Sequence, residues 1–165
     1  MTQFLVTVLL WFCAIGCGLI AGLYFAFSTF IVTALGRIDQ AAGIATMNAI
    51  NVTIVRSLFM PLFFATTLAC AVLAVLAVLR WDEPGAALML AGGLIYVIGM
   101  FLCTILFNVP LNNTLAAVDP GGADAAAVWA RYLKEWTRWN HLRTVASTVA
   151  SGLFIAALVA DSRAI

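Results

Sequence analysis

The sequence predicts an all-α protein: a polytopic membrane four-helix bundle with partly helical linkers on one face. The composition indicates this class, because 65% of the residues are hydrophobic and only 9% are charged, against about 25% charged in soluble domains. The apolar residues also form continuous blocks, and a helix needs about 20 such residues to cross a bilayer. Continuous blocks disfavour strands, since strands in lipid alternate and must close into a barrel. We expect one domain, residues 1–165, with spans at about 4–33, 57–79, 86–108 and 141–160.

The first span begins without the basic region of a signal peptide, and its apolar run is longer than that of most such signals. Ala14, Gly18, Gly22 and Ala26 recur along it at four-residue spacing. Small residues at this spacing predict a smooth face for close helix packing.

Polar segments separate the other spans. Residues 80–85 form a short turn ending in Pro-Gly, so the second and third spans are antiparallel neighbours. The linkers at 34–56 and 109–140 are longer and are expected to be partly helical. Pro110 disfavours a straight helix at its position, and the helix predicted over 123–140 continues into the fourth span.

Positive charge is distributed unequally between the two faces. The two long linkers and the entrance to the fourth span carry six basic residues, whereas the opposite face carries only Arg80 and Arg163. The positive-inside rule therefore places the long linkers in the cytoplasm and both termini outside, in the cell membrane. The net charge of +1 gives no reason to expect a nucleic-acid partner.

The four cysteines, Cys13, Cys17, Cys70 and Cys103, all fall inside predicted spans. Cys13 and Cys17 are one helical turn apart, which is also the spacing of a metal or redox pair. No histidine or acidic residue lies nearby in the sequence to complete such a site, so we interpret all four as buried free thiols.

Polar residues from four segments are expected to gather at the end of the bundle that carries the long linkers. In an up-down-up-down bundle the end of the first span, the start of the second, the end of the third and the start of the fourth meet there. The residues are Tyr24, Ser28, Asn48, Asn51, Arg56, Asn108, Asn112, Asn113, Asn140, His141 and Arg143.

Helical spacing places Trp136, Trp139, Asn140 and Arg143 on one face. Two interpretations compete. The face is either an interfacial belt with snorkelling cations, or the roof of a pocket that stacks a flat ligand on tryptophan and holds its oxygens. The asparagines favour the pocket, because each is costly at the membrane edge unless it is hydrogen-bonded. They could equally serve as helix caps or as hydrogen bonds between helices.

Other kinds of site lack their residues in the sequence. His141 is the single histidine and has no second ligand at its end of the bundle, so we expect no zinc, haem or other metal. The sequence contains no glycine-rich phosphate loop and no nucleophile elbow. Acidic residues are almost confined to linkers, which argues against chemistry by paired carboxylates.

At these residues the chain resembles the anthrone oxygenase-like family of small integral membrane proteins. The resemblance covers nearly the whole chain and is carried by Gly22–Ser28, Met47–Asn51, Asn108–Asn112 and Trp136–Arg143. Thr33-Ala34 departs from the proline common there in the family. The resemblance implies oxidation of a lipophilic anthrone to an anthraquinone by dioxygen, without metal or flavin.

The residues suit that chemistry, because an anthrone has an acidic methylene whose enolate can reduce dioxygen. We expect His141 as the base and Trp136 and Trp139 as the aromatic platform. The expected donors to the enolate oxygen are Asn51, Asn108, Asn112, Asn140 and Arg143.

The alternative is a non-enzymatic membrane protein that binds a quinone or a lipid-like ligand, or that serves as a subunit of a membrane complex. Its polar end would then be a hydrogen-bond network fixing the four helices. A transporter is less compatible, since no charged residue falls at mid-membrane and no inverted repeat is visible.

Overall fold

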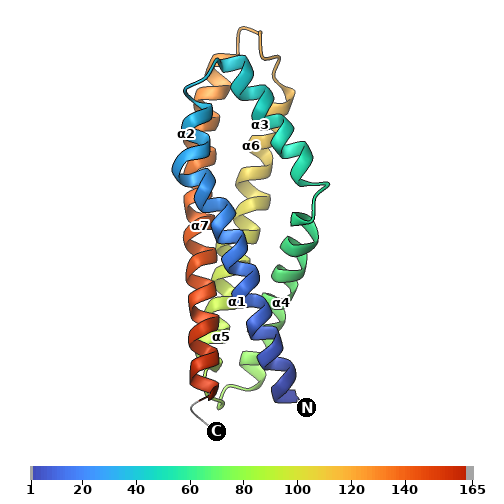
Figure 1. Ribbon diagram of the computed structural model, residues 1–165, viewed down its shortest axis with the longest axis vertical. Coiled ribbons are helices and arrows are strands. Elements are labelled where there is room, and N and C mark those ends of the chain that lie inside the picture. The colour runs from blue at the N-terminus through green and yellow to red at the C-terminus, as the bar shows by residue number, and fades with distance from the viewer. Residues whose placement is uncertain (1, 163–165) are drawn as a thin grey trace.

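The protein is an all-α bundle of four long helical rods, as the sequence predicted (Figure 1). The structure, a computed structural model, describes residues 2–162, and no strand occurs among them. Four segments are long and apolar enough to cross a membrane: Gln3–Leu35, Phe59–Leu79, Ala86–Ala117 and Ala125–Ala160. The chain is therefore an integral membrane protein.

Two of the rods, the first and the third, contain changes of helix type. The elements in chain order are α1 (Thr2–Ala26), the π-helix η1 (Phe27–Ile31), α2 (Val32–Leu35), α3 (Gln40–Ile54), α4 (Phe59–Leu79), α5 (Ala86–Tyr96), the π-helices η2 (Val97–Leu102) and η3 (Thr104–Asn108), α6 (Val109–Ala117) and α7 (Ala125–Ser162). The long linkers are thus partly helical, and the end of the second linker runs without interruption into the last rod, as expected.

The third rod is longer than the sequence suggested. Helix α6 begins at Val109 and carries Pro110 in its first turn, the part of a helix that tolerates proline best. The π-helix η3 directly before it already has a changed hydrogen-bond pattern. The proline is thereby accommodated, and the rod continues to Ala117.

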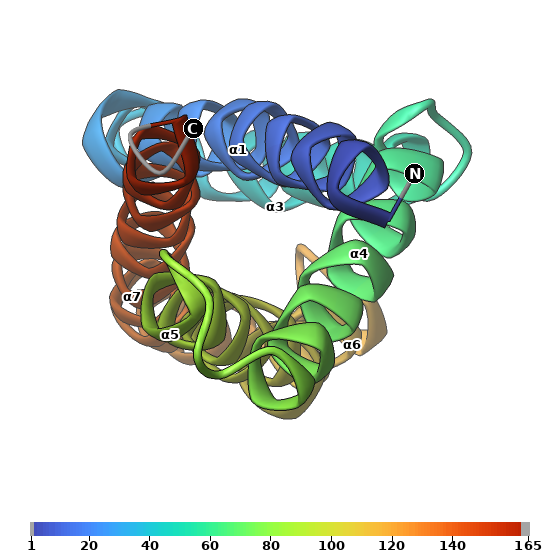
Figure 2. The same ribbon diagram turned by 90° about the horizontal axis from the view of Figure 1, so that it is seen from below.

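The four rods form a closed arrangement in which α1 packs against α7 and α4, and α5 packs against α4 and α7 (Figure 2). Small residues allow the closest approaches. A Cβ atom added at Gly93 would lie 2.6 Å from the carbonyl oxygen of Cys70, and one at Gly99 would lie 2.7 Å from Ala146 Cβ. The face predicted on the first span makes contact at its beginning, where Ser151 Oγ donates to the carbonyl oxygen of Ala14. Gly22 differs, because a Cβ atom added there would have no neighbour within 4 Å among the described residues beyond its own stretch of helix.

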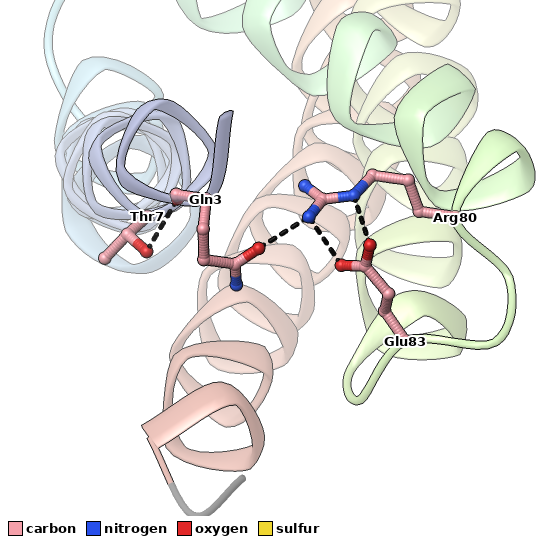
Figure 3. Close-up of polar contacts among 4 residues, drawn as sticks. All are labelled: Gln3, Thr7, Arg80 and Glu83. Carbon is pink, nitrogen blue, oxygen red and sulfur yellow. Dashed lines mark hydrogen bonds and ion pairs between the residues drawn. The ribbon is translucent and has the colours of Figure 1, made fainter. Parts of the chain in front are cut away.

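The end of the bundle that holds the N-terminus is closed by a small polar cluster (Figure 3). Arg80 Nε donates to Glu83 Oε1 at 2.7 Å, and Arg80 Nη2 donates to Gln3 Oε1 at 2.5 Å. These contacts join the turn between α4 and α5 to the beginning of α1. Arg80 therefore has local partners, whereas Arg163 lies outside the described residues.

Two apolar cores are stacked along the bundle. The core nearer the termini contains the buried free thiols Cys13, Cys17 and Cys70 together with Phe154. All four cysteines are buried free thiols, as predicted. The second core, at the linker end, is built by α2, α3, α6 and the beginning of α7 around Leu115 and Trp129. Of the polar residues named from the sequence, Asn108, Asn140 and Arg143 are buried, whereas Arg56 and His141 are exposed.

Candidate functional site

A cavity of about 180 Å³ opens where the two cores meet. Its walls come from α1, η1, α3, α4, η3, α6 and α7, and most of the lining is aromatic or aliphatic. Six lining residues can donate or accept hydrogen bonds: Tyr24, Asn51, Thr104, Asn112, Trp136 and Arg143. A mostly apolar pocket with a few polar groups is the usual form of a small-molecule site.

Arg143 is the one cation that lines this cavity, and it is only 4% exposed. Its Nη2 donates to Asn140 Oδ1 at 2.7 Å and its Nη1 donates to Thr104 Oγ1 at 3.3 Å. The guanidinium carbon lies 4.2 Å from the ring centre of Tyr24 and 5.1 Å from that of Trp136. Neutral dipoles and aromatic faces therefore stabilise the cation.

Among the described side chains, no acidic residue pairs with Arg143. The ion pairs found between residues 2 and 162 join Arg80 to Glu83 and Arg131 to Glu135, both outside the cavity. The Nε atom of Arg143 is buried and has no hydrogen-bond partner in this part of the chain. A buried cation without a counter-ion is costly, so the cavity is a favourable place for a ligand oxygen that carries negative charge.

Asn140 holds Arg143 from behind the cavity wall. Its Nδ2 donates to the carbonyl oxygen of Tyr24 and to Ser28 Oγ, both at 2.7 Å, while its Oδ1 accepts from Arg143. Asn140 is fully buried and does not line the cavity. Its amide thus connects the first rod to the guanidinium and fixes the direction in which Arg143 points.

The borders of the π-helices supply the contacts on the other two rods. Tyr24 lies three residues before η1, and Thr104 is the first residue of η3. The Thr104 hydroxyl donates to the carbonyl oxygen of Met100 at 2.8 Å and accepts from Arg143. π-Helical turns are often found at functional sites, and here two of them border residues that contact the guanidinium.

The structure brings some of the expected asparagines to the cavity. Asn51 and Asn112 line it together with Arg143. Asn112 Oδ1 accepts from the Tyr132 hydroxyl at 2.8 Å, whereas the Nδ2 atom of Asn51 is buried and has no partner among the described residues. Asn108 lies behind the wall, where its Nδ2 donates to the carbonyl oxygen of Trp136 at 3.2 Å and so joins η3 to α7.

The two expected platform tryptophans point to different places. Trp136 lines the cavity, and its buried Nε1 has no partner in the described chain. Trp139 stacks on Phe107, with ring centres 3.8 Å apart. The guanidinium carbon of Arg138 lies 5.6 Å from the centre of the Trp139 ring. It borders a separate surface groove. Their three-residue offset turns Trp139 far enough around α7 to leave the cavity.

His141 lies on the exposed side of α7 and does not line the cavity. Its role as a base therefore stays a prediction. Sequence reasoning placed Tyr24 at the polar end without assigning it to the site, and it missed Thr104. Thr104 precedes Asn108 by one helical turn, so helical spacing from that asparagine was the signal available for it.

A family model described as anthrone oxygenase matches residues 52–153, which is more than half of the chain. The matched segment includes Thr104, Asn112, Trp136 and Arg143 of the cavity, and it begins just after Asn51. No curated protein and no solved structure matches the chain.

Proposed function

Because this chain belongs to the anthrone oxygenase family, we propose that it is a cofactor-independent oxygenase acting on a flat, lipophilic, anthrone-like substrate in the cell membrane. The observation that carries this proposal is Arg143, a buried cation without an acidic partner in the described chain, on the wall of an apolar cavity. The buried, mostly apolar surroundings strengthen its attraction for a negatively charged oxygen.

The proposed reaction begins with loss of a proton from the substrate methylene. Negative charge then develops on the carbonyl oxygen as the enolate forms. A preorganised donor that faces this oxygen in a water-excluded site stabilises the transition state, and removal of one such donor typically costs about 10²–10³ in rate. We assign this task to Arg143, with Asn51 and Asn112 as further donors and Trp136 as the aromatic platform.

The size of the cavity limits how the substrate sits. About 180 Å³ is below the roughly 300–1,000 Å³ of typical ligand pockets, so only part of a three-ring substrate fits inside. Phe64 and Ile105 line the cavity but are 54% and 45% exposed. We propose that the substrate enters between α4 and η3 at these side chains and that its remaining rings stay in the opening.

The expected residues outside the lining receive supporting roles in this proposal. Asn140 orients Arg143, and Asn108 and Trp139 hold η3 against α7. A base that is separated from its proton can act through one water molecule. His141 would have to act in this way, because its exposed side chain lies outside the cavity.

The alternative is a non-enzymatic protein that binds a quinone or lipid-like ligand in the same cavity, or that is a subunit of a membrane complex. The hydrogen bonds of Asn108 and Asn140 favour a structural role for at least these two residues, because both satisfy polar groups between rods. Such a network is needed in an enzyme and in a binding protein alike.

Oxygen uptake separates the two functions. The purified protein in detergent is given an anthrone, and dioxygen consumption is compared with a detergent blank and with the Arg143→Met variant. Arg138→Met is the matched control, because Arg138 lies on the same helix but is exposed and outside the cavity. We expect uptake by the wild type and by Arg138→Met only. A binding protein would be supported instead if dioxygen uptake is no faster than the blank and an anthraquinone raises the melting temperature.

A further inference from the structure

We propose that Tyr24 is the catalytic residue that delivers a proton to the departing peroxide oxygen and so completes quinone formation. The inference rests on the proposed oxygenase function and adds to it a general acid. The sequence predicted no chemical role for Tyr24 and placed it only among the polar residues at one end of the bundle.

Tyr24 is held in a fixed position at the cavity. It is 5% exposed and lines the cavity together with Arg143. Its carbonyl oxygen accepts from Asn140 Nδ2, and its ring lies beneath the guanidinium of Arg143 at 4.2 Å. The edge of its ring also meets Phe59, with ring centres 6.3 Å apart. Backbone and ring are thus both constrained.

As a donor, the hydroxyl of Tyr24 has only a weak partner, although its oxygen also interacts with the side chains of Arg143 and Thr104. It donates to Met100 Sδ at 3.9 Å, and a thioether sulfur is only a weak acceptor. Buried tyrosine hydroxyls usually have a good hydrogen-bond partner. In the second core the Tyr132 hydroxyl follows this rule, because it donates to Asn112 Oδ1 at 2.8 Å. The Tyr24 hydroxyl is therefore free to exchange its weak contact for one to a ligand oxygen.

Tyr24 is also the one lining side chain that can give up a proton and take it back. The other polar lining groups are the amides of Asn51 and Asn112, the Thr104 hydroxyl, the Trp136 indole and the Arg143 guanidinium. None of these releases a proton readily in proteins. The adjacent guanidinium would stabilise the negative charge on Tyr24 while its proton is absent.

The enolate carbon bonds to dioxygen, and the proton first removed from the methylene is returned to the peroxide to give a hydroperoxide. In this step carbon is oxidised by two electrons and dioxygen is reduced to peroxide. The remaining C–H bond on that carbon then breaks, and its electron pair forms the new carbonyl. The O–O bond breaks, and its electron pair stays with the distal oxygen. This oxygen takes the Tyr24 proton and departs as water. The C–H proton returns to Tyr24, so that anthrone and dioxygen give anthraquinone and water.

The test compares Tyr24→Phe with Tyr96→Phe. Tyr96 is fully buried, its hydroxyl has no partner among the described residues, and it lies outside the cavity lining. Each variant removes one hydroxyl and keeps the ring. Dioxygen uptake, peroxide and quinone are measured on the same detergent-purified sample with an anthrone, beside its melting temperature.

We expect Tyr24→Phe to fold like the wild type and to form quinone about 10²–10⁴-fold more slowly, the usual contribution of a general acid. It should still take up dioxygen in a first phase and accumulate peroxide, because the blocked step follows oxygen addition. Tyr96→Phe should keep the wild-type ratio of quinone formed to dioxygen consumed.

Two results would overturn the assignment while leaving the oxygenase function in place. One is quinone formation by Tyr24→Phe as fast as by Tyr96→Phe. The other is that Tyr24→Phe loses dioxygen uptake and quinone formation to the same extent, accumulates no peroxide and melts at a lower temperature. This result would mean that Tyr24 has only a structural role. A wild type that consumes no dioxygen would overturn both the function and the assignment.

Discussion

Replacement of Arg143 by methionine tests whether this side chain serves folding or ligand binding. Methionine fills a similar space with an unbranched apolar chain, and it removes the charge and both hydrogen bonds. The bond from Arg143 Nη2 to Asn140 Oδ1 is short, at 2.7 Å, and the one to Thr104 Oγ1 is longer, at 3.3 Å. The contacts with the Tyr24 and Trp136 rings are lost as well.

The stability terms nearly cancel. Loss of the short charged hydrogen bond costs about 1.5–3 kcal/mol, and loss of the longer one costs less. Loss of the ring contacts costs about 0.5–2 kcal/mol. In the opposite direction, removal of a buried cation that has no acidic partner stabilises the folded state by several kcal/mol, because its desolvation penalty disappears. We therefore expect the free energy of unfolding to change by no more than about 2 kcal/mol. At about 2–4 °C per kcal/mol, the melting temperature should move by less than about 8 °C.

The effect on function should be much larger. Loss of the donor to the enolate oxygen should lower kcat/KM for an anthrone by about 10²–10³. Arg143→Lys should fall between wild type and methionine, because lysine keeps the charge but lacks the planar two-pronged donor. Melting temperature, anthraquinone titration and dioxygen uptake are measured on one detergent-solubilised preparation. A methionine variant that melts far earlier while its folded fraction keeps full kcat/KM would refute the reasoning.

Three further predictions concern the scaffold. Asn140→Ala should lower the free energy of unfolding by about 2–4 kcal/mol, read from detergent melting curves, because it leaves several buried polar groups unpaired; unchanged melting would contradict this. Gly93→Ala should lower the free energy of unfolding by about 1–3 kcal/mol, because the added methyl group clashes with α4. Gly22→Ala is the matched control, since its methyl group meets open space. An equal loss of stability in both variants would argue against the packing explanation. Single cysteines at the exposed positions Arg37 and Glu83 should label from the cytoplasmic and the outer side of the cell membrane, and labelling of both from one side would reject the topology.

Much of the fold was predictable because membrane spans depend on a property that is local in sequence. Continuous apolar blocks gave the four rods, and the short turn at 80–85 gave the pairing of two of them. The end of the third rod was harder to predict from the sequence. Pro110 alone predicts an interruption, and only its position directly after a π-helix explains why the rod continues.

The site was predictable where its residues share one helix. Trp136 and Arg143 are seven residues apart, which places both on the same face of α7, and both line the cavity. Contributions from other rods depend on how each rod is rotated. Nothing local distinguishes Tyr24, which meets Arg143, from Phe25, which is 58% exposed. The same limit applies to Asn108, whose amide supports the wall from behind.

The unbroken length of α7 bears on how deep the cavity lies in the bilayer. Its 38 residues rise about 57 Å, nearly twice the roughly 30 Å of the hydrocarbon layer. From Arg143 to Ser162 the rise is about 28 Å. With the C-terminal end of α7 at one membrane surface, the guanidinium therefore lies level with the opposite surface, and the second core stands among or beyond the lipid headgroups. A flat amphiphile resting in that one leaflet would reach the opening by sliding sideways, and its oxidised product would return to the same leaflet.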